Sequence, residues 1–257
     1  MRTHLILLTA ALGLPACSGK TSDTSTSGTT DTSTEADTDD SGDTDEDESV
    51  EPEYPTGTAT GCDLTNHSYL LDFTSARVLE PAALGPILAD AIGDSLAMGI
   101  SAQTDSNVSV LLALTDDGNQ DMCTPSVHPP DGTWVDPVMA VGPADLSVEV
   151  DGSPVTLSSF QFTAASNAEC TGIESGVFQS DLDARLLGPA LGSLVGTEDP
   201  QGICDALLAF GATCGACDSD GEAFCIKLII DRMSAPDRGI PLEEVTTEDI
   251  AANSECG

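Results

Sequence analysis

The cysteines constrain this chain more than any other feature of its sequence. Besides Cys17, eight cysteines are spread over the chain after residue 60: Cys62, Cys123, Cys170, Cys204, Cys214, Cys217, Cys225 and Cys256. An even number of cysteines in an exported chain implies a framework of disulfides. Many connectivities are compatible with eight cysteines, and the sequence does not choose among them. The local pairing that we expect first joins Cys217 to Cys225, across an Asp-Gly turn.

The N-terminal residues 1–16 indicate export. A single arginine precedes a short apolar run from Leu5 to Leu14, which Pro15 and Ala16 close. A bilayer core needs about 20 apolar residues to be crossed by a helix, and this run is much shorter. It is therefore typical of a signal peptide rather than a spanning helix.

The residues Leu14, Pro15, Ala16 and Cys17 resemble the lipobox of bacterial lipoproteins, in which Leu and two small residues precede a lipidated cysteine. Pro15 departs from the usual Ala or Ser. The resemblance implies cleavage before Cys17, diacylglycerol on its sulfur and a further acyl chain on its amino terminus, which together anchor a chain stably. Ser18 resembles the pattern that is sorted to the outer membrane. The alternative is an ordinary signal peptide cut near Ala16.

The charge of the chain excludes one class of partner. The sequence has 44 acidic and 7 basic residues, for a formal net charge of −37 at pH 7, and the acidic excess is found throughout the chain after the signal peptide. A surface of this sign repels phosphate backbones, and no basic patch interrupts it. We therefore expect no nucleic acid partner. The expected partners are a membrane, through Cys17, and a protein or glycan ligand of unknown identity.

Residues 17–60 are expected to form the lipidated cysteine and a disordered acidic tether. The segment consists largely of Ser, Thr, Asp, Glu and Gly, with no aromatic residue before Tyr54, so it cannot bury enough surface to fold. Its stretch 37–48 has acidic residues at EF-hand spacing. An EF-hand needs a helix on each side, whereas Thr-rich coil and Pro52 flank this stretch, so we interpret it as part of the tail.

Residues 61–257 are predicted to fold as a mainly β domain, an antiparallel sandwich or barrel-like structure with a few short helices, stabilised by disulfides. Apolar residues alternate with others in several runs, which begin at Tyr69, Val108, Phe160 and Phe224. Residues 148–157 read as a hairpin that turns at Asp151 and Gly152.

Two stretches favour helices, and one favours a loop. Residues 86–97 have apolar residues at helical spacing, and residues 203–210 are apolar on one face and end at Gly211. Residues 124–137 contain four prolines and Trp134, the one tryptophan of the chain. We expect this last stretch to form a surface loop.

The stretch CGACDSDGEAFC, residues 214–225, invites a redox or zinc interpretation. A thioredoxin-type cysteine needs a helix N-terminus to stabilise its thiolate, but acidic turn residues follow Cys217 here, and their charge opposes ionisation. A zinc ribbon needs a second close cysteine pair, and none is present. We therefore expect structural disulfides, with no bound metal and no cofactor.

Gly93, Asp94, Ser95 and Leu96 spell the nucleophile block of the GDSL esterases. The resemblance implies a serine nucleophile with a histidine base from a C-terminal Asp-x-x-His motif, which this chain lacks. After the signal peptide the histidines are His67 and His128. An exported serine hydrolase that uses Ser95 is the alternative function.

Carboxylates close in sequence provide a second alternative. Asp181 with Asp183, or Asp116 and Asp117 with Asp121, have oxygen ligands of the kind that calcium prefers. They would suit a calcium-stabilised adhesion module, although solvated turn carboxylates are the simpler interpretation.

The order of signal peptide, acidic tether and cysteine-rich domain resembles bacterial surface lipoproteins of unknown function. The resemblance covers residues 1–60 and implies no activity for the rest of the chain. We expect an extracytoplasmic, lipid-anchored module that is non-enzymatic and that serves in binding or structure.

Overall fold

The computed structural model of the 257-residue chain describes residues 51–85, 95–150, 153–188 and 196–256. The signal peptide, Cys17 and the tether up to residue 50 lie outside the described residues. Residues from Val50 onward form one compact unit. Within it, the last ten residues expected in the tether, 51–60, contact the folded domain.

The fold is one antiparallel sheet with short helices, so the predicted fold class is confirmed. Along the sheet the strands follow the order β1-β3-β4-β6-β7-β8-β9-β10-β2, and β5 pairs with β4. The strands are β1 (Ser68–Leu70), β2 (Arg77–Glu80), β3 (Leu96–Gln103), β4 (Asn107–Asp116), β5 (Asn119–Gln120), β6 (Gly132–Val135), β7 (Val138–Val150), β8 (Ser153–Ser166), β9 (Gly172–Asp183) and β10 (Cys225–Pro236). The described helices are the 3-10 helix η1 (Ala82–Leu84), α3 (Pro200–Leu208) and α4 (Thr247–Ala252).

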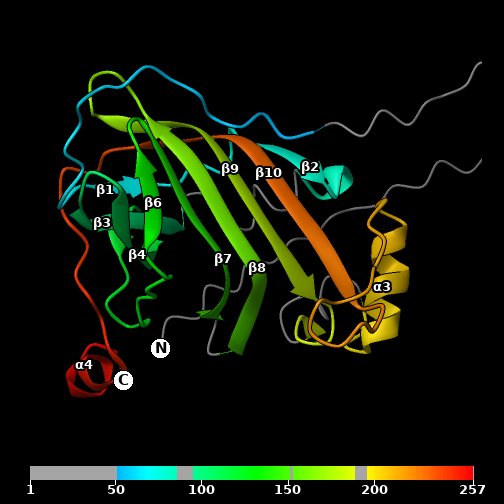
Figure 1. Cartoon of the computed structure of the whole chain (residues 1–257). Helices are drawn as coiled ribbons and strands as arrows, with labels where there is room; N and C mark the ends of the chain where they lie inside the picture. The colour runs from blue at the N-terminus through cyan, green and yellow to red at the C-terminus, as the bar shows by residue number, and fades with distance from the viewer. Residues whose placement is uncertain (1–50, 86–94, 151–152, 189–195, 257) are drawn as a thin grey trace, which may run out of the picture. The chain divides into compact units, whose positions relative to one another are not determined.

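The sheet curls until its first strand meets β10. Single bridges join Tyr69 to Asp237 and Asp72 to Ser234, beyond the part of β10 that pairs with β2. The long strands β7 to β10 lie side by side across the molecule, as Figure 1 shows. The curl gives the sheet an inner face, and this face carries the main core.

Alternation in the sequence explains which side chains fill this core. In β4, Val108, Val110 and Leu112 are buried, and in β8 the same is true of Phe160 and Phe162. Every second residue of a strand points to the same face, so these runs place their apolar side chains together. The predicted strands around them are confirmed.

The predicted hairpin between β7 and β8 is also confirmed. Val150 pairs with Ser153, and the pairing continues along both strands to Val138 and Ala165. The two turn residues themselves lie outside the described residues. A bulge interrupts the pairing near Gly142, whose φ is +92°. A Cβ atom at this position would come within 2.1 Å of the Phe160 carbonyl oxygen, so the bulge requires glycine.

The predicted loop over residues 124–137 was partly wrong. Residues 132–135 form β6, and the side chain of Trp134 is 4% exposed within the main core. The prolines lowered the strand signal of the whole stretch, whereas β6 begins only after the last of the clustered prolines. A Cβ atom at Gly132 would meet the Ala140 carbonyl oxygen at 2.6 Å, which explains why glycine starts this strand.

The helix predicted over residues 203–210 is confirmed as α3, which begins three residues earlier than predicted. The Asp199 carboxylate caps it by accepting a hydrogen bond from the Gly202 backbone N–H at 2.9 Å. Ile203, Cys204 and Leu207 of α3 pack in a second, smaller core.

Most of the helix predicted over residues 86–97, namely 86–94, lies outside the described residues. The last two of its residues, Leu96 and Ala97, belong to strand β3, so the prediction was wrong there. In the part of the chain that the structure describes, the helices are too short or too polar to cross a membrane.

Four disulfides link the domain, and they use all eight cysteines expected to pair. They join Cys62 to Cys170, Cys123 to Cys256, Cys204 to Cys214, and Cys217 to Cys225. The first two connect segments more than 100 residues apart, with separations of 108 and 133 residues. The long connections tie the loop after β8 to the start of the domain and the C-terminal residues to the loop after β5.

Candidate functional site

The two cysteines of the C-x-x-C motif belong to different disulfides. Cys214 pairs with Cys204 of helix α3, and Cys217 pairs with Cys225 at the start of β10. The pairing that the sequence favoured first, Cys217 with Cys225, is therefore confirmed. Because both motif cysteines are bonded to partners outside the motif, the motif forms no internal dithiol pair of the thioredoxin type.

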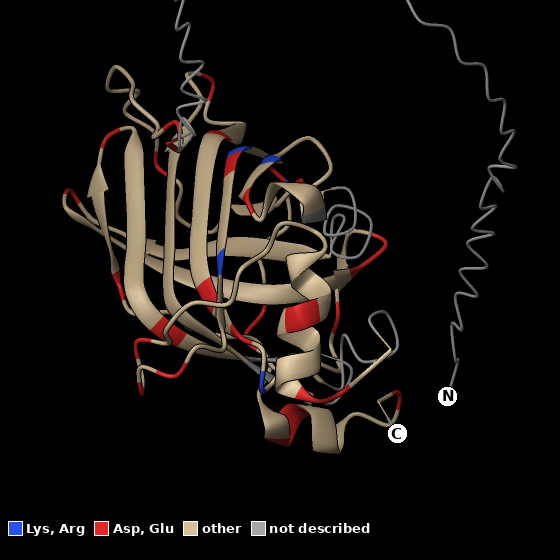
Figure 2. Cartoon of the chain, turned by 90° about the vertical axis from the view of Figure 1, so that its right-hand side faces the viewer, with Lys and Arg blue, Asp and Glu red and all other residues tan. Residues whose placement is uncertain are grey.

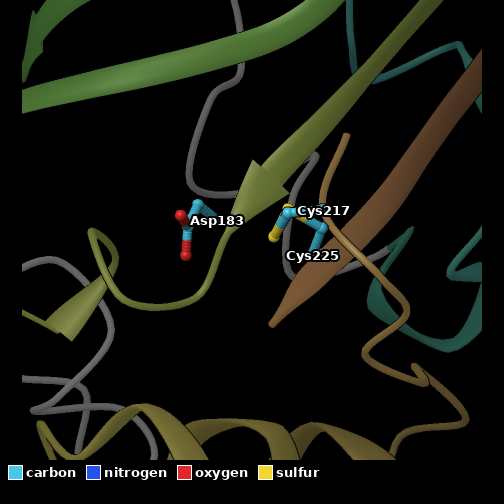
Figure 3. Close-up of side chains that lie close together, drawn as sticks. All are labelled: Asp183, Cys217 and Cys225. Atoms are coloured by element: carbon cyan, nitrogen blue, oxygen red, sulfur yellow. A yellow bond between two sulfur atoms is a disulfide. The ribbon is translucent and has the colours of Figure 1, made fainter. Parts of the chain in front are cut away.

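One group of three potential metal ligands lies at the same place. Atoms of Asp183, Cys217 and Cys225 lie within 4.8 Å of one another, at the end of β9, as Figure 3 shows. Metal binding by cysteine requires the thiolate, and here both sulfurs form the disulfide. The geometry of this group is thus explained by a disulfide beside an acidic side chain.

Arg185 contacts several residues around the Cys217–Cys225 disulfide. Its guanidinium contacts the carboxylates of Asp183 at 2.7 Å and Asp220 at 2.6 Å, and it lies 5.4 Å from the centre of the Phe224 ring. The hydrogen bonds from Arg185 lower the pKa of both carboxyls. The arginine therefore joins the end of β9 to the loop that carries Cys217.

Among the described residues, no hydrogen bond joins Ser95 to either histidine of the esterase alternative. Ser95 directly precedes β3. Residues 93 and 94, the first two of the four-residue esterase motif, lie outside the described residues. His67 contacts the Asp237 carboxylate at 2.7 Å through Nδ1, and His128 lies 3.4 Å from Glu244. Each histidine thus contacts a carboxylate on the C-terminal part of the chain, and the hydrolase stays a prediction without geometric support.

Two of the carboxylates considered for calcium, those of Asp121 and Asp183, have other partners. Asp121 accepts hydrogen bonds from the Cys123 backbone N–H and the Thr124 hydroxyl. Burial, followed by the nearby charge of Asp218, raises the pKa of Asp181. Among the described residues, no three carboxylates place their oxygens as close together as the group beside Cys217. Calcium-stabilised adhesion stays a prediction.

A polar groove opens at one end of the curled sheet. Its volume is about 410 Å³, which is within the size range of small-molecule sites. Segments from three parts of the chain form it: the residues before β1, the turn between β3 and β4, and the end of β6. The residues that line it are Gly61, Cys62, Asp63, Thr65, Gln103, Thr104, Asp105, Trp134 and Asp136.

Asp136 forms one wall of the groove and is fixed by three hydrogen bonds. Its carboxylate accepts bonds from the backbone N–H of Thr60 at 2.9 Å, the Thr60 hydroxyl at 2.8 Å and the backbone N–H of Gly61 at 2.7 Å. These donors, the backbone N–H groups first, lower the pKa of Asp136. The carboxylate is therefore ionised at neutral pH.

Gln103 and a disulfide fix a second part of the lining. The Gln103 side chain accepts a hydrogen bond from the Leu64 N–H at 2.7 Å and donates one to the Cys62 carbonyl oxygen at 3.0 Å. Cys62 is itself bonded to Cys170. Hydrogen bonds from Thr65, its side chain first, lower the pKa of the exposed Asp63. The groove is thus bordered by rigid backbone and by ionised carboxylates.

The four arginines of the domain are engaged elsewhere. Arg77 and Arg232 contact carboxylates near β10, Arg185 contacts those beside Cys217, and Arg238 donates to the Gly118 carbonyl oxygen at 2.9 Å. In Figure 2, few positions along the ribbon are Lys or Arg, whereas many are Asp or Glu. Of the described residues that line the groove, three are carboxylates and none is basic, so the groove favours positive charge and repels anions.

Among the described residues, the inside of the curled sheet has only much smaller cavities. Leu71, Met98, Phe160 and Phe178 are among the residues that line an apolar cavity of about 10 Å³, which holds roughly one water molecule. Phe160 and Phe178 pack edge to face, with ring centres 5.5 Å apart. Side chains therefore fill the inner face as they fill an ordinary core.

No pattern in the sequence predicts the groove. Asp63, Asp105 and Asp136 come from separate segments with no motif spacing among them. The pairing of Cys62 with Cys170, which sets the start of the domain, was one of many that the cysteines allowed. Only the fold brings these residues together.

Comparison with known proteins gives no match to this chain, neither among family models nor among curated proteins or solved structures. The interpretation of the groove therefore depends on its own geometry and charge.

Proposed function

We propose that this chain is a lipid-anchored, extracytoplasmic binding module of the bacterial cell envelope, held at the outer membrane through Cys17, and that the groove is its binding site. The lipobox-like residues before Cys17 support the anchor. The four disulfides support an oxidising compartment outside the cytoplasm.

One observation supports the binding function most directly: carboxylates in the groove are exposed, whereas most other reactive or charged side chains of the domain already contact one another. The eight cysteines of the domain, both histidines and most of the basic side chains make structural contacts. The groove, by comparison, has the size of a ligand site and carboxylates such as Asp105 at its exposed rim. A rigid site with ionised carboxylates suits a positively charged group of an extracytoplasmic partner protein.

A titration tests the groove. The full chain after the signal peptide, with Cys17→Ser to keep it in solution, is labelled with nitrogen-15 and mixed with tri-lysine. We expect the amide signals of Gly61, Thr65 and Thr104 to move, and tri-glutamate to leave them unchanged. The double variant Asp63→Asn/Asp105→Asn should weaken binding about tenfold, since two attractive charges are lost, each a contribution of about 0.7 kcal/mol.

A matched control separates the groove from the general acidity of the surface. Glu174→Gln removes one charge from an exposed position on β9 that does not line the groove. We expect this variant to bind as the parent does. Shifts spread evenly over the surface, or equal losses in the control and the groove variant, would remove the groove as a specific site.

Fractionation tests the anchor separately. We expect the protein with Cys17 to be recovered with the outer membrane and the Cys17→Ser variant to be exported but recovered in the soluble fraction. A variant that stays with the membrane would show that another part of the chain holds it there.

A further inference from the structure

Residues 51–61 form a strap across the sheet, although they belong to no strand. Figure 1 shows this segment, in blue, passing from the side of β2 and β10 toward the side of β6. Its two ends are fixed by hydrogen bonds and ion pairs, whereas its middle makes few contacts. The strap leads directly from the tether into Cys62.

The first fixed point is Glu53. Its backbone N–H donates to the Asp231 carboxylate at 3.1 Å, and its own carboxylate contacts Arg232 and, at 3.6 Å, Arg77. Asp231 is fully buried and binds Arg77 through both oxygens. This anchor point is therefore built on a rigid pair between β10 and β2.

The middle of the strap lies against the domain at Tyr54, Pro55 and Gly57. The Tyr54 hydroxyl accepts a hydrogen bond from the Gln179 side chain at 2.7 Å, and Pro55 is buried. Gly57 lies against Pro137, where a Cβ atom would come within 2.7 Å of the proline ring. The close approach explains why glycine occupies this position.

The second fixed point is Asp136, which receives the three hydrogen bonds from Thr60 and Gly61 described above. One residue later, Cys62 is buried and covalently joined to Cys170 in the loop between β8 and β9. A pull on the tether thus meets polar contacts first and a covalent bond second.

We propose that the strap is an extensible element that peels from the sheet under tension and is arrested by the Cys62–Cys170 disulfide. Its contacts are made by single residues along an extended segment, so they break one after another rather than together. The sheet behind Cys62 is held by long antiparallel pairings and by the core, and it stays folded when the strap leaves.

Peeling would lengthen the tether while the domain stays folded. The nine residues from the first fixed point at Glu53 to Gly61 span at most roughly 30–32 Å when extended, at about 3.3–3.6 Å per residue. Because Gly61 and Asp136 both line the groove, the same event would remove part of one of its walls. The role of membrane tension rests on the proposed lipid anchor, but the strap itself is testable without lipid.

Optical tweezers test the strap on the full chain after the signal peptide, with Cys17→Ser and with handles at its two ends. We expect a reversible low-force step that releases about 30–32 Å of contour before any unfolding of the sheet. Glu53→Gln and Asp136→Ala should lower the force of this step, whereas Glu174→Gln, which removes a charge away from the strap, should not.

The disulfide provides the decisive comparison. In the double variant Cys62→Ser/Cys170→Ser, we expect the first step to continue into the sheet and to release more chain than in the parent. Three results would each overturn the proposal: no step before global unfolding, a parent step as long as that of the double variant, or a step that the two strap variants leave unchanged. None of them bears on lipidation, because the protein tested carries no lipid.

Discussion

The carboxylate of Asp136 accepts hydrogen bonds from both the backbone N–H and the hydroxyl of Thr60, across 76 residues of sequence. The contact joins the strap to the end of β6 and shapes the groove at the same time. Its dependence on charge gives the first prediction.

Acid should release the end of the strap. The pKa of Asp136 lies below its ordinary value of 3.8 because the folded state provides hydrogen-bond donors to the ionised form. The resulting stability is therefore fully present above pH 3.8 and is lost as the pH falls through the lower folded-state pKa. We expect the amide signals of Thr60 and Gly61 to titrate with a midpoint below 3.8. A midpoint above this value would contradict the contact.

Removal of Asp231 should destabilise the domain strongly. Its side chain is fully buried, and the Asp231→Ala variant leaves Arg77 and the Glu53 N–H without their acceptor. We expect a loss of about 2–4 kcal/mol in the free energy of unfolding. Chemical denaturation measures it, and Glu174→Ala, at an exposed site on the neighbouring strand, should change stability by less than about 0.5 kcal/mol. Equal effects of the two variants would contradict the role of Asp231.

Burial also acts on Asp231 itself. Burial alone would raise the pKa of this carboxyl, but the hydrogen bonds from Arg77 and the Glu53 N–H outweigh it and lower the pKa. The pair thus contributes stability above the ordinary carboxyl pKa and loses it in acid, in the same direction as Asp136. Denaturation curves of the parent and Asp231→Ala should converge as the pH falls toward 2.

The disulfides should differ in their contributions. Replacing Cys62 and Cys170 by serine opens a loop of 108 residues, whereas replacing Cys217 and Cys225 opens one of 8 residues. The chain-entropy estimate is about 4–5 kcal/mol for the first and about 2–3 kcal/mol for the second. Denaturation of the two double-serine variants measures the order, and a larger loss from the short loop would contradict it.

Glycine at position 142 should be essential to the bulge between β7 and β8. The Gly142→Ala variant combines a positive φ with a Cβ atom 2.1 Å from the Phe160 carbonyl oxygen, so we expect a loss of at least about 2 kcal/mol. Gly221 also has a positive φ but has open space around it, and Gly221→Ala should cost only about 1 kcal/mol. Similar thermal midpoints for the two variants would show that the clash is relieved.

Local sequence patterns predicted most of the strands, whereas contacts between distant residues determine how those strands are arranged and which side chains are buried. The alternation around Val108 and Phe160 and the turn at residues 151–152 were sufficient for the strands, because side-chain period and turn chemistry are local properties. Local patterns did not predict the buried position of Trp134, because the strand that carries it is four residues long and follows a proline-rich stretch. Its burial depends on β7, which the local sequence does not show.

The candidate site was less predictable than the fold. The cysteine count predicted the chemistry of the sulfurs, and the acidic turn at Cys217 predicted its local partner. The groove depends on the pairing of Cys62 with Cys170 and on the meeting of Asp136 with Thr60, both across long separations. A single sequence does not indicate which residues far apart in the chain come into contact.

Disulfide mapping of the exported, unreduced protein tests the central claim most directly, because that claim is a rigid domain whose sulfurs are all structural. After alkylation and digestion, mass spectrometry should find the four pairs 62–170, 123–256, 204–214 and 217–225, with no alkylated cysteine in the domain. Alkylated sulfhydryls at Cys214 and Cys217, a bond between these two, or a metal bound to them would contradict it.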